Sequence, residues 1–323
     1  MKLIPTPPAP DFTQYTCSAS IDFVKVFHPT HVSLPIESKQ RNIHCDLGQG
    51  QCTTIHDPSP EDLDAVLPLL DDARIIELEV SLDFRVRGKP DDAERERMLH
   101  ELKSRIISHL YPWEAPGIQE GHRVSHREGK AEQIVSLSGD ITPARIGSTL
   151  YLGHSNSRYA NPDQPNFASI RFYLKQRDNR HALAPKRWSV RVEVTLTREG
   201  CENFGLRTLD DLRDFNYRKL NEYFRMVLPS YSFGTLKRRR RSPKHGRSFD
   251  PTLQAAMEEW VAKYLARRVR DAGTWSLLNT VFATPERVPY PYANRRIGME
   301  LNNLTRRFAR GRMRSAGAST AAS

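Results

Sequence analysis

Three short segments alternate between apolar and reactive polar residues, and this alternation is the strongest constraint on the fold. Successive side chains of a β-strand point to opposite faces of its sheet, so each segment is predicted to be a strand with one buried face. The polar positions carry acids, bases and a phenol. The three segments are residues 76–84 (IELEVSLDF), 170–175 (IRFYLK) and 190–196 (VRVEVTL).

If the three strands belong to one sheet, a single face of it collects carboxylates, arginines, a lysine and a phenol. Carboxylates bind hard cations, a phenol can act as a nucleophile, and basic side chains bind phosphate. This combination indicates phosphodiester chemistry.

The positive charge of the chain is concentrated in its last quarter. The 323 residues include 49 Lys and Arg against 38 Asp and Glu, a net charge of +11. From Leu236 onward there are 19 basic and 6 acidic residues, so the first 235 residues are close to neutral. A neutral body with a cationic C-terminal part favours a polyanionic partner, and nucleic acid is the first candidate.

The chain has features of a cytoplasmic protein. No apolar run approaches the ~20 residues needed to span a bilayer, and the N-terminus lacks the apolar stretch of a signal peptide. No membrane partner is therefore expected. The four cysteines include no C-x-x-C pair. Because thiols are kept reduced in the cytoplasm, we expect these cysteines to be reduced. His44, Cys45, Cys52 and His56 do not follow a common zinc spacing.

The order of predicted elements indicates an α+β fold with a central, mostly antiparallel sheet flanked by helices. Helices are expected from Pro60, capped by Ser59, over 91–110 and over 206–227. Short strands are expected at 134–138 and 148–152. The predicted divisions are a disordered arm (1–11), a catalytic domain (12–230), a basic linker (231–250), a basic helical DNA-binding region (251–314) and a disordered tail (315–323).

Tyr173 is the candidate nucleophile. Arg171 and Lys175 lie two residues to either side on the same strand face, so the phenol is predicted to sit between two cations. Positive charge favours a phenolate, and the same cations can bind the phosphate that it attacks. A tyrosine in a strand is more commonly a packing residue. Tyr151 is the rival nucleophile, although few cations adjoin it.

Glu79, Asp83 and Glu193 are the candidate metal ligands. Carboxylates spaced four residues apart on one strand face, with another acid on a neighbouring strand, suit Mg²⁺ or Mn²⁺, which prefer oxygen ligands. Carboxylates on a sheet face are usually solvated, however, and Glu193 could simply pair with Arg191.

The order of five short motifs resembles that of rolling-circle replication initiators (Rep proteins) of plasmids and filamentous phages. The early strand with a central aspartate is SIDFV (20–24), and the acidic strand follows as ELEVSLD (77–83). The next three are TLYLGHSNS (149–157), IRFYLK (170–175) and RVEVTL (191–196). This chain departs from the family pattern in having Glu79 where an aspartate is usual.

The resemblance implies that Tyr173 nicks one strand at a replication origin. The products are a 5′-phosphotyrosyl link and a free 3′-hydroxyl that a polymerase extends. Glu79, Asp83 and Glu193 would hold the cation, while Arg171 and Lys175 would position the strand. Candidate partners are origin DNA in duplex and single-stranded form, a host helicase and a second copy of the chain.

Further residues are expected to contact DNA. The turn after the third motif offers hydroxyls, and the basic C-terminal region offers a run of cations. These candidates are Ser155, Ser157, Arg191, Lys237, Arg238, Arg239, Arg240, Arg241, Arg267 and Arg268. The alternative function is a non-enzymatic, sequence-specific DNA-binding protein, such as a phage or plasmid repressor, that uses the sheet only as a scaffold.

Overall fold

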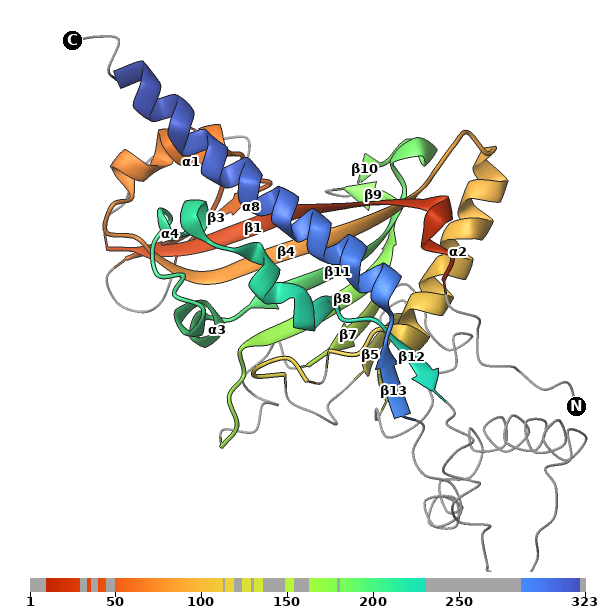
Figure 1. Ribbon diagram of the computed structural model, residues 1–323. Coiled ribbons are helices and arrows are strands. Elements are labelled where there is room, and N and C mark those ends of the chain that lie inside the picture. Colours follow the sequence, from red (N-terminus) through yellow and green to blue (C-terminus); the bar gives the residue numbers. More distant parts are fainter. Residues whose placement is uncertain are drawn as a thin grey trace, which may run out of the picture.

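The computed structural model describes residues 10–29, 34–35, 40–44, 50–112, 114–118, 124–128, 131–135, 149–153, 163–178, 181–230 and 286–319. In this part of the chain, nine strands form one sheet in the order β2-β3-β1-β4-β11-β8-β7-β5-β6 (Figure 1). The strands are β1 (Tyr15–His28), β2 (Gln40–His44), β3 (Gln51–His56), β4 (Arg74–Val86), β5 (Val124–Glu128), β6 (Ala131–Val135), β7 (Thr149–Leu152), β8 (Ala168–Lys175) and β11 (Ser189–Leu196).

Neighbouring strands of this sheet pair antiparallel throughout. With the helices below, the predicted α+β class and antiparallel sheet are confirmed. Two small antiparallel pairs accompany the sheet: β9 (Arg177–Asp178) with β10 (His181–Ala182), and β12 (Val227–Ser230) with β13 (Glu286–Pro289).

The α-helices are α1 (Pro60–Val66), α2 (Asp92–His109), α3 (Arg198–Asn203), α4 (Asp211–Asp214) and α8 (Pro291–Ser319). The 3₁₀ helices are η1 (Phe12–Gln14), η3 (Leu67–Leu69), η5 (Pro185–Arg187) and η6 (Tyr217–Phe224). None of these helices is long and apolar enough to cross a membrane.

Local signals placed the first two helices correctly. The Ser59 hydroxyl accepts a hydrogen bond from the Asp62 amide, and the Asp62 carboxylate accepts one from the Ser59 amide, so two backbone N–H groups at the start of the helix have partners. The α-helix ends at Val66, and a 3₁₀ turn containing Pro68 follows.

The predicted helix over 206–227 is wrong. The chain forms the short helix α4, an extended residue at Phe215, and then the 3₁₀ helix η6. Two contacts account for the break. The Asn216 side chain accepts a hydrogen bond from the Arg218 amide and begins a new turn, while the Tyr217 amide donates to the Thr305 hydroxyl on α8.

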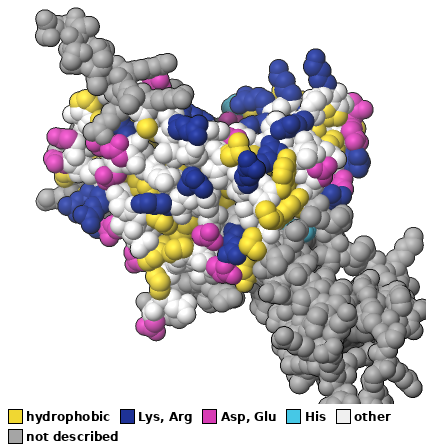
Figure 2. Space-filling model, viewed as in Figure 1, with side chains coloured by type: hydrophobic (Ala, Val, Ile, Leu, Met, Phe, Trp, Pro, Cys, Tyr) yellow, Lys and Arg dark blue, Asp and Glu magenta, His cyan; other side chains and the backbone are white. Residues whose placement is uncertain are grey.

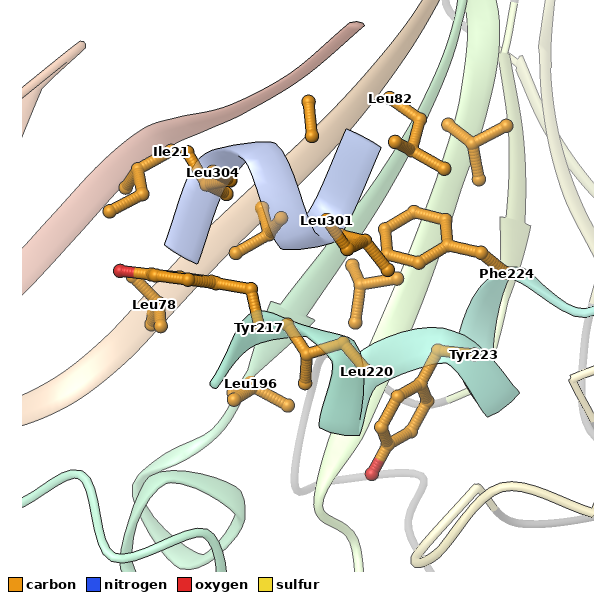
Figure 3. Packing of buried hydrophobic residues seen from close by; sticks show 14 of the residues in the cluster. Ile21, Leu78, Leu82, Leu196, Tyr217, Leu220, Tyr223, Phe224, Leu301 and Leu304 are labelled. Carbon is orange, nitrogen blue, oxygen red and sulfur yellow. The ribbon is translucent and has the colours of Figure 1, made fainter. Parts of the chain in front are cut away.

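The hydrophobic core lies between the apolar face of the sheet and the helices that cover it. Figure 1 shows α8 lying across the sheet. In Figure 3, Leu301 and Leu304 of α8 and Leu220 and Phe224 of η6 point toward the strands, where they meet side chains such as Leu82. All five side chains belong to one buried cluster. The reactive side chains of the strands therefore point away from this core.

The final basic helix belongs to this body, although the sequence placed it in a separate DNA-binding region. Arg307 donates to the Ala19 carbonyl oxygen at 3.2 Å, and the ring of Tyr290 lies 5.9 Å from that of Phe12. The strands β12 and β13 pair across the chain interval 231–285, so the body resumes at Glu286. The tail predicted from residue 315 is helical as far as Ser319.

Several predicted segments lie outside the described residues: most of the N-terminal arm, the linker 231–250, residues 251–285 and the last four residues. The Tyr290 hydroxyl donates to the carbonyl oxygen of Pro10, so Pro10, which was predicted to lie in the arm, belongs to the folded body. The expectation of reduced thiols is wrong for Cys52, which is disulfide-bonded and therefore not a zinc ligand. Cys17 and Cys201 are free thiols.

Truncation of Leu301 to alanine tests whether α8 is part of the body. Leu301 is fully buried, so Leu301→Ala should lower the free energy of unfolding by about 3 kcal/mol, measured by urea denaturation. Met299→Ala, on the exposed side of the same helix, is the control and should change it by less than about 0.5 kcal/mol. Equal, small effects of the two substitutions would show that α8 does not stabilise the sheet.

Candidate active site

The polar face of the central strands is organised in rows, because residues directly opposite each other on antiparallel strands share a face. Two neighbouring rows contain most of the predicted site. From β1 to β7, the first row is Ser18, Asp83, Arg191, Tyr173 and Thr149. The second row is Ser20, Ser81, Glu193, Arg171 and Tyr151.

Tyr173 and Glu193 form the centre of the candidate site. The Tyr173 hydroxyl donates a hydrogen bond of 2.6 Å to Oε1 of Glu193. Arg171 donates from Nε to the other oxygen of Glu193 and from Nη2 to Oε1 of Glu79 at 3.3 Å. Its guanidinium also lies 5.3 Å from the centre of the Tyr173 ring. The structure therefore brings together the predicted nucleophile, one predicted cation and two predicted acids.

The electrostatic prediction for Tyr173 is corrected by the structure. Burial, and then the charge of Glu193 and the hydrogen bond to it, raise the pKa of Tyr173 well above its ordinary value, and Arg191 and Arg171 only partly oppose this. Lys175 does not assist, because its ammonium group pairs with Asp178 at 3.2 Å. The phenol is thus a protonated hydrogen-bond donor, and Glu193 is placed to accept its proton.

The acids that converge are Asp22, Glu79 and Glu193. One carboxylate oxygen of each lies within 4.8 Å of those of the other two. Asp22 reaches this position next to a β-bulge between Ile21 and Phe23, where β1 shifts register against Glu79. A bulge re-aims side chains locally and strengthens the twist of a strand. Sequence reasoning did not assign Asp22 to the site; its only signal was the aspartate at the centre of the SIDFV motif.

Asp83 is not a member of the triad, so its assignment as a metal ligand is corrected. Arg191 binds both of its oxygens, with Nε to Oδ1 at 2.9 Å and Nη2 to Oδ2 at 2.6 Å. Ser189 donates to Oδ1 at 2.6 Å, and Arg85 donates to Oδ2 at 3.1 Å. Burial opposes ionisation, yet the hydrogen bonds and charge of Arg191 hold the pKa of Asp83 below its ordinary value. Asp83 is therefore an ionised anchor for Arg191.

Arg191, which was predicted to contact DNA, lies in this buried ion network. Only 5% of the residue is exposed, and it also donates from Nη1 to Asp22. The same Nη1 lies 3.6 Å from Oε1 of Glu193. Arg191 thus links Asp83 to two of the three converging acids and orients them.

Glu79 carries a perturbed carboxyl group. Burial and the neighbouring charge of Glu193 raise the pKa of Glu79 to about 8, against the opposing effects of Arg171 and the Thr195 hydroxyl. The Thr195 hydroxyl donates to Oε2 of Glu79 at 2.5 Å. At neutral pH, without a bound cation, the favoured state of Glu79 is the protonated one.

The raised pKa of Glu79 predicts a pH dependence of stability. Between about pH 4.5 and pH 8 the unfolded protein has lost this proton and the folded protein retains it, so stability falls as the pH rises, by up to about 1.4 kcal/mol per unit. In EDTA, Glu79→Gln should remove this slope from urea-unfolding free energies measured between pH 5 and 8. Glu77→Gln, on the same strand, should retain it. An unchanged slope in Glu79→Gln would contradict the assignment.

The residues of the triad suit a divalent cation. Their donor atoms are carboxylate oxygens from three strand positions, the type that Mg²⁺ and Mn²⁺ prefer. Glu79 and Glu193 are buried and Asp22 is half-buried, so the group has one partly open side.

The remaining candidates lie at the edge of the site or outside the described residues. Tyr151 shares the polar face and stands directly opposite Arg171, one strand farther than Arg171 from the acids. The following predicted DNA contacts lie outside the described residues: Ser155, Ser157, Lys237, Arg238, Arg239, Arg240, Arg241, Arg267 and Arg268.

Three comparisons with known proteins found no relative of this chain. No protein-family model, no curated protein and no solved structure matches the chain.

Proposed function

We propose that this protein is a rolling-circle replication initiator that nicks one DNA strand by tyrosine transesterification. The observation that carries the proposal is the hydrogen bond from Tyr173 to Glu193, beside the converging acids and Arg171. A phenol, a proton acceptor, a guanidinium and a set of cation ligands are the groups that this reaction requires.

In the proposed reaction the Tyr173 oxygen attacks a backbone phosphorus atom while its proton passes to Glu193. A phosphorus–oxygen bond to Tyr173 forms as the bond to the 3′-oxygen breaks. The electron pair of that bond leaves with the 3′-oxygen, which takes a proton from solvent. The products are a 5′-phosphotyrosyl link and a free 3′-hydroxyl, so the strand can later be rejoined by the reverse reaction.

The other residues support this step. Arg171 provides positive charge beside the Tyr173 ring for the attacked phosphate. Asp22, Glu79 and Glu193 would hold Mg²⁺ or Mn²⁺, which when bound offsets negative charge on phosphoryl oxygens. Arg191 and Asp83 keep Asp22 and Glu193 in place.

Origin DNA is the proposed partner, and the cytoplasm is the proposed location because replication takes place there. Figure 2 shows Lys and Arg side chains spread over the face on which α8 lies. Arg295 and Arg306 are exposed positions of that helix. With the cationic segment from Leu236 onward, they would supply the phosphate contacts of duplex binding, which weakens as salt rises.

The alternative is a non-enzymatic DNA-binding protein. One observation favours it: Asp22, Glu79, Asp83 and Glu193 each accept a hydrogen bond from arginine, as in a purely structural ion network. In that case the network would fix the sheet and the basic residues alone would bind DNA.

Formation of a covalent protein–DNA adduct distinguishes the two proposed functions. The full chain is incubated with Mg²⁺ or Mn²⁺ and labelled single-stranded origin DNA, and the denatured protein is analysed by gel and by mass spectrometry after proteolysis. A nucleotide-linked peptide at Tyr173 supports the enzyme. Specific DNA binding with no linked peptide supports the alternative.

A further inference from the structure

The guanidinium of Arg171 lies beside the converging acids, where the proposed divalent cation would bind. Its guanidinium bridges Glu193, through Nε, and Glu79, through Nη2 at 3.3 Å. These are two of the three converging acids. A positive charge between two acids meets the same electrostatic requirement as a bound metal ion. Arg171 therefore acts as the counter-ion of Glu193 and, once Glu79 has lost its proton, of Glu79 as well.

Arg171 differs from the other arginine of the site in its access to solvent. The side chain of Arg171 is 37% exposed, whereas Glu79 and Glu193 are at most 5% exposed. The side chain of Arg191 is 6% exposed and is held by both oxygens of Asp83. Arg171 can therefore turn outward and remain hydrated, while movement of Arg191 would leave a buried charge unpaired.

Departure of Arg171 alone would remove the nearest positive charge from Glu193 and from the Glu79 carboxyl group and leave only Arg191, 3.6 Å from Glu193, which is costly for buried acids. Exchange for a divalent cation removes that cost, because the incoming charge replaces the guanidinium. The freed guanidinium stays tethered to β8, two residues from Tyr173 on the same face. That is where a phosphate must lie for attack by Tyr173.

We propose that Arg171 is an exchangeable counter-ion that couples cation binding to DNA binding. Without a cation it pairs with Glu193 and donates a hydrogen bond to Glu79; when a divalent cation binds, it turns outward and binds a phosphate of the DNA strand. This role rests on the proposed function of the site. Because coupling between two ligands is reciprocal, Mn²⁺ should tighten DNA binding by the same factor as DNA tightens Mn²⁺ binding.

The first test measures Mn²⁺ binding to the full chain without DNA, by electron paramagnetic resonance of free Mn²⁺. Arg171→Gln removes the competing charge and should bind Mn²⁺ at least about tenfold more tightly than the unmodified protein. Arg85→Gln is the matched control, because Arg85 is also 37% exposed and pairs with Asp83, outside the triad. Its Mn²⁺ affinity should stay within about threefold of the unmodified value.

The second test measures binding of a single-stranded oligonucleotide with and without Mn²⁺. The unmodified protein and Arg85→Gln should gain at least about fivefold in affinity on Mn²⁺ addition, and Arg171→Gln should lose this gain. Arg171→Lys, which keeps the charge but lacks the fixed, planar donor geometry of the guanidinium, should bind Mn²⁺ with intermediate affinity. This variant keeps the test decisive if Arg171→Gln is unstable.

Unchanged or weaker Mn²⁺ binding by Arg171→Gln, or no Mn²⁺ binding by any of these proteins, overturns the proposal. These measurements need no nicking. If Arg171→Gln fails them while the unmodified protein still forms the Tyr173 adduct, only the counter-ion role is lost. If no adduct forms but Mn²⁺ binding responds as expected, the proposed nicking function fails instead.

Discussion

Tyr173→Phe is expected to abolish the covalent protein–DNA adduct, with a loss of at least about a thousandfold in the rate of nicking. The substitution removes only the hydroxyl that donates to Glu193, so the ring and its contact with Arg171 are retained. Binding of the same oligonucleotide should remain within about threefold, since most affinity for DNA comes from phosphate contacts elsewhere. Adduct formation and oligonucleotide binding are measured on the same preparation.

The control for this experiment is Tyr292→Phe, which removes a phenol from the exposed side of α8 and should leave the adduct unchanged. Tyr151→Phe addresses the rival nucleophile. Tyr151 lies opposite Arg171, one strand farther from Glu193, so Tyr173 is the better placed of the two. If the adduct persists in Tyr173→Phe and disappears in Tyr151→Phe, the nucleophile is Tyr151 and the assignment of Tyr173 is wrong.

Asp83→Asn should lower the free energy of unfolding by about 3–5 kcal/mol, the largest stability effect expected at the site. Asparagine keeps the shape of the side chain but leaves Arg191 buried without its main counter-charge, and the hydrogen bonds of Arg191 at 2.6 and 2.9 Å are lost or weakened. The measurement is urea denaturation at pH 7 with EDTA.

A comparison with Asp22→Asn makes the prediction specific. Asp22 is half-buried and shares Arg191 with Asp83, so its substitution should cost less stability than that of Asp83. It should, however, lower Mn²⁺ affinity by at least about tenfold, because Asp22 is one of the three converging acids proposed to hold the cation. If Asp83→Asn instead lost Mn²⁺ binding and kept its stability, Asp83 would be the ligand that the sequence predicted.

The sequence identified the strands of the site because their alternation of side chains is a local property. The same alternation placed Glu79, Asp83, Arg191 and Glu193 on one face. It could not pair them, because the register between β4 and β11 depends on contacts more than a hundred residues apart. In that register Arg191 stands opposite Asp83, so Asp83 pairs with Arg191 and does not join the converging acids.

Other errors of sequence reasoning also come from tertiary contacts. Asp22 reaches the site beside a bulge, and alternation assumes a strand without one. The helix expected over 206–227 breaks where the Tyr217 amide binds Thr305, which lies 88 residues further along the chain. The basic residues of α8 suggested a DNA-binding helix, but its buried positions, such as Leu304, show that its other side completes the core.

The contacts between α8 and the start of the chain have a consequence for biosynthesis. Phe12 packs near Tyr290 and its carbonyl oxygen accepts a hydrogen bond from Arg296, so Phe12 cannot complete these contacts until a segment 284 residues further along the chain has been synthesised. Until the residues of α8 as far as Phe308 have emerged, the apolar face of the sheet that this helix covers remains exposed to water. Yields of the intact chain should therefore rise with chaperone co-expression, and fragments that stop before residue 290 should accumulate as aggregates.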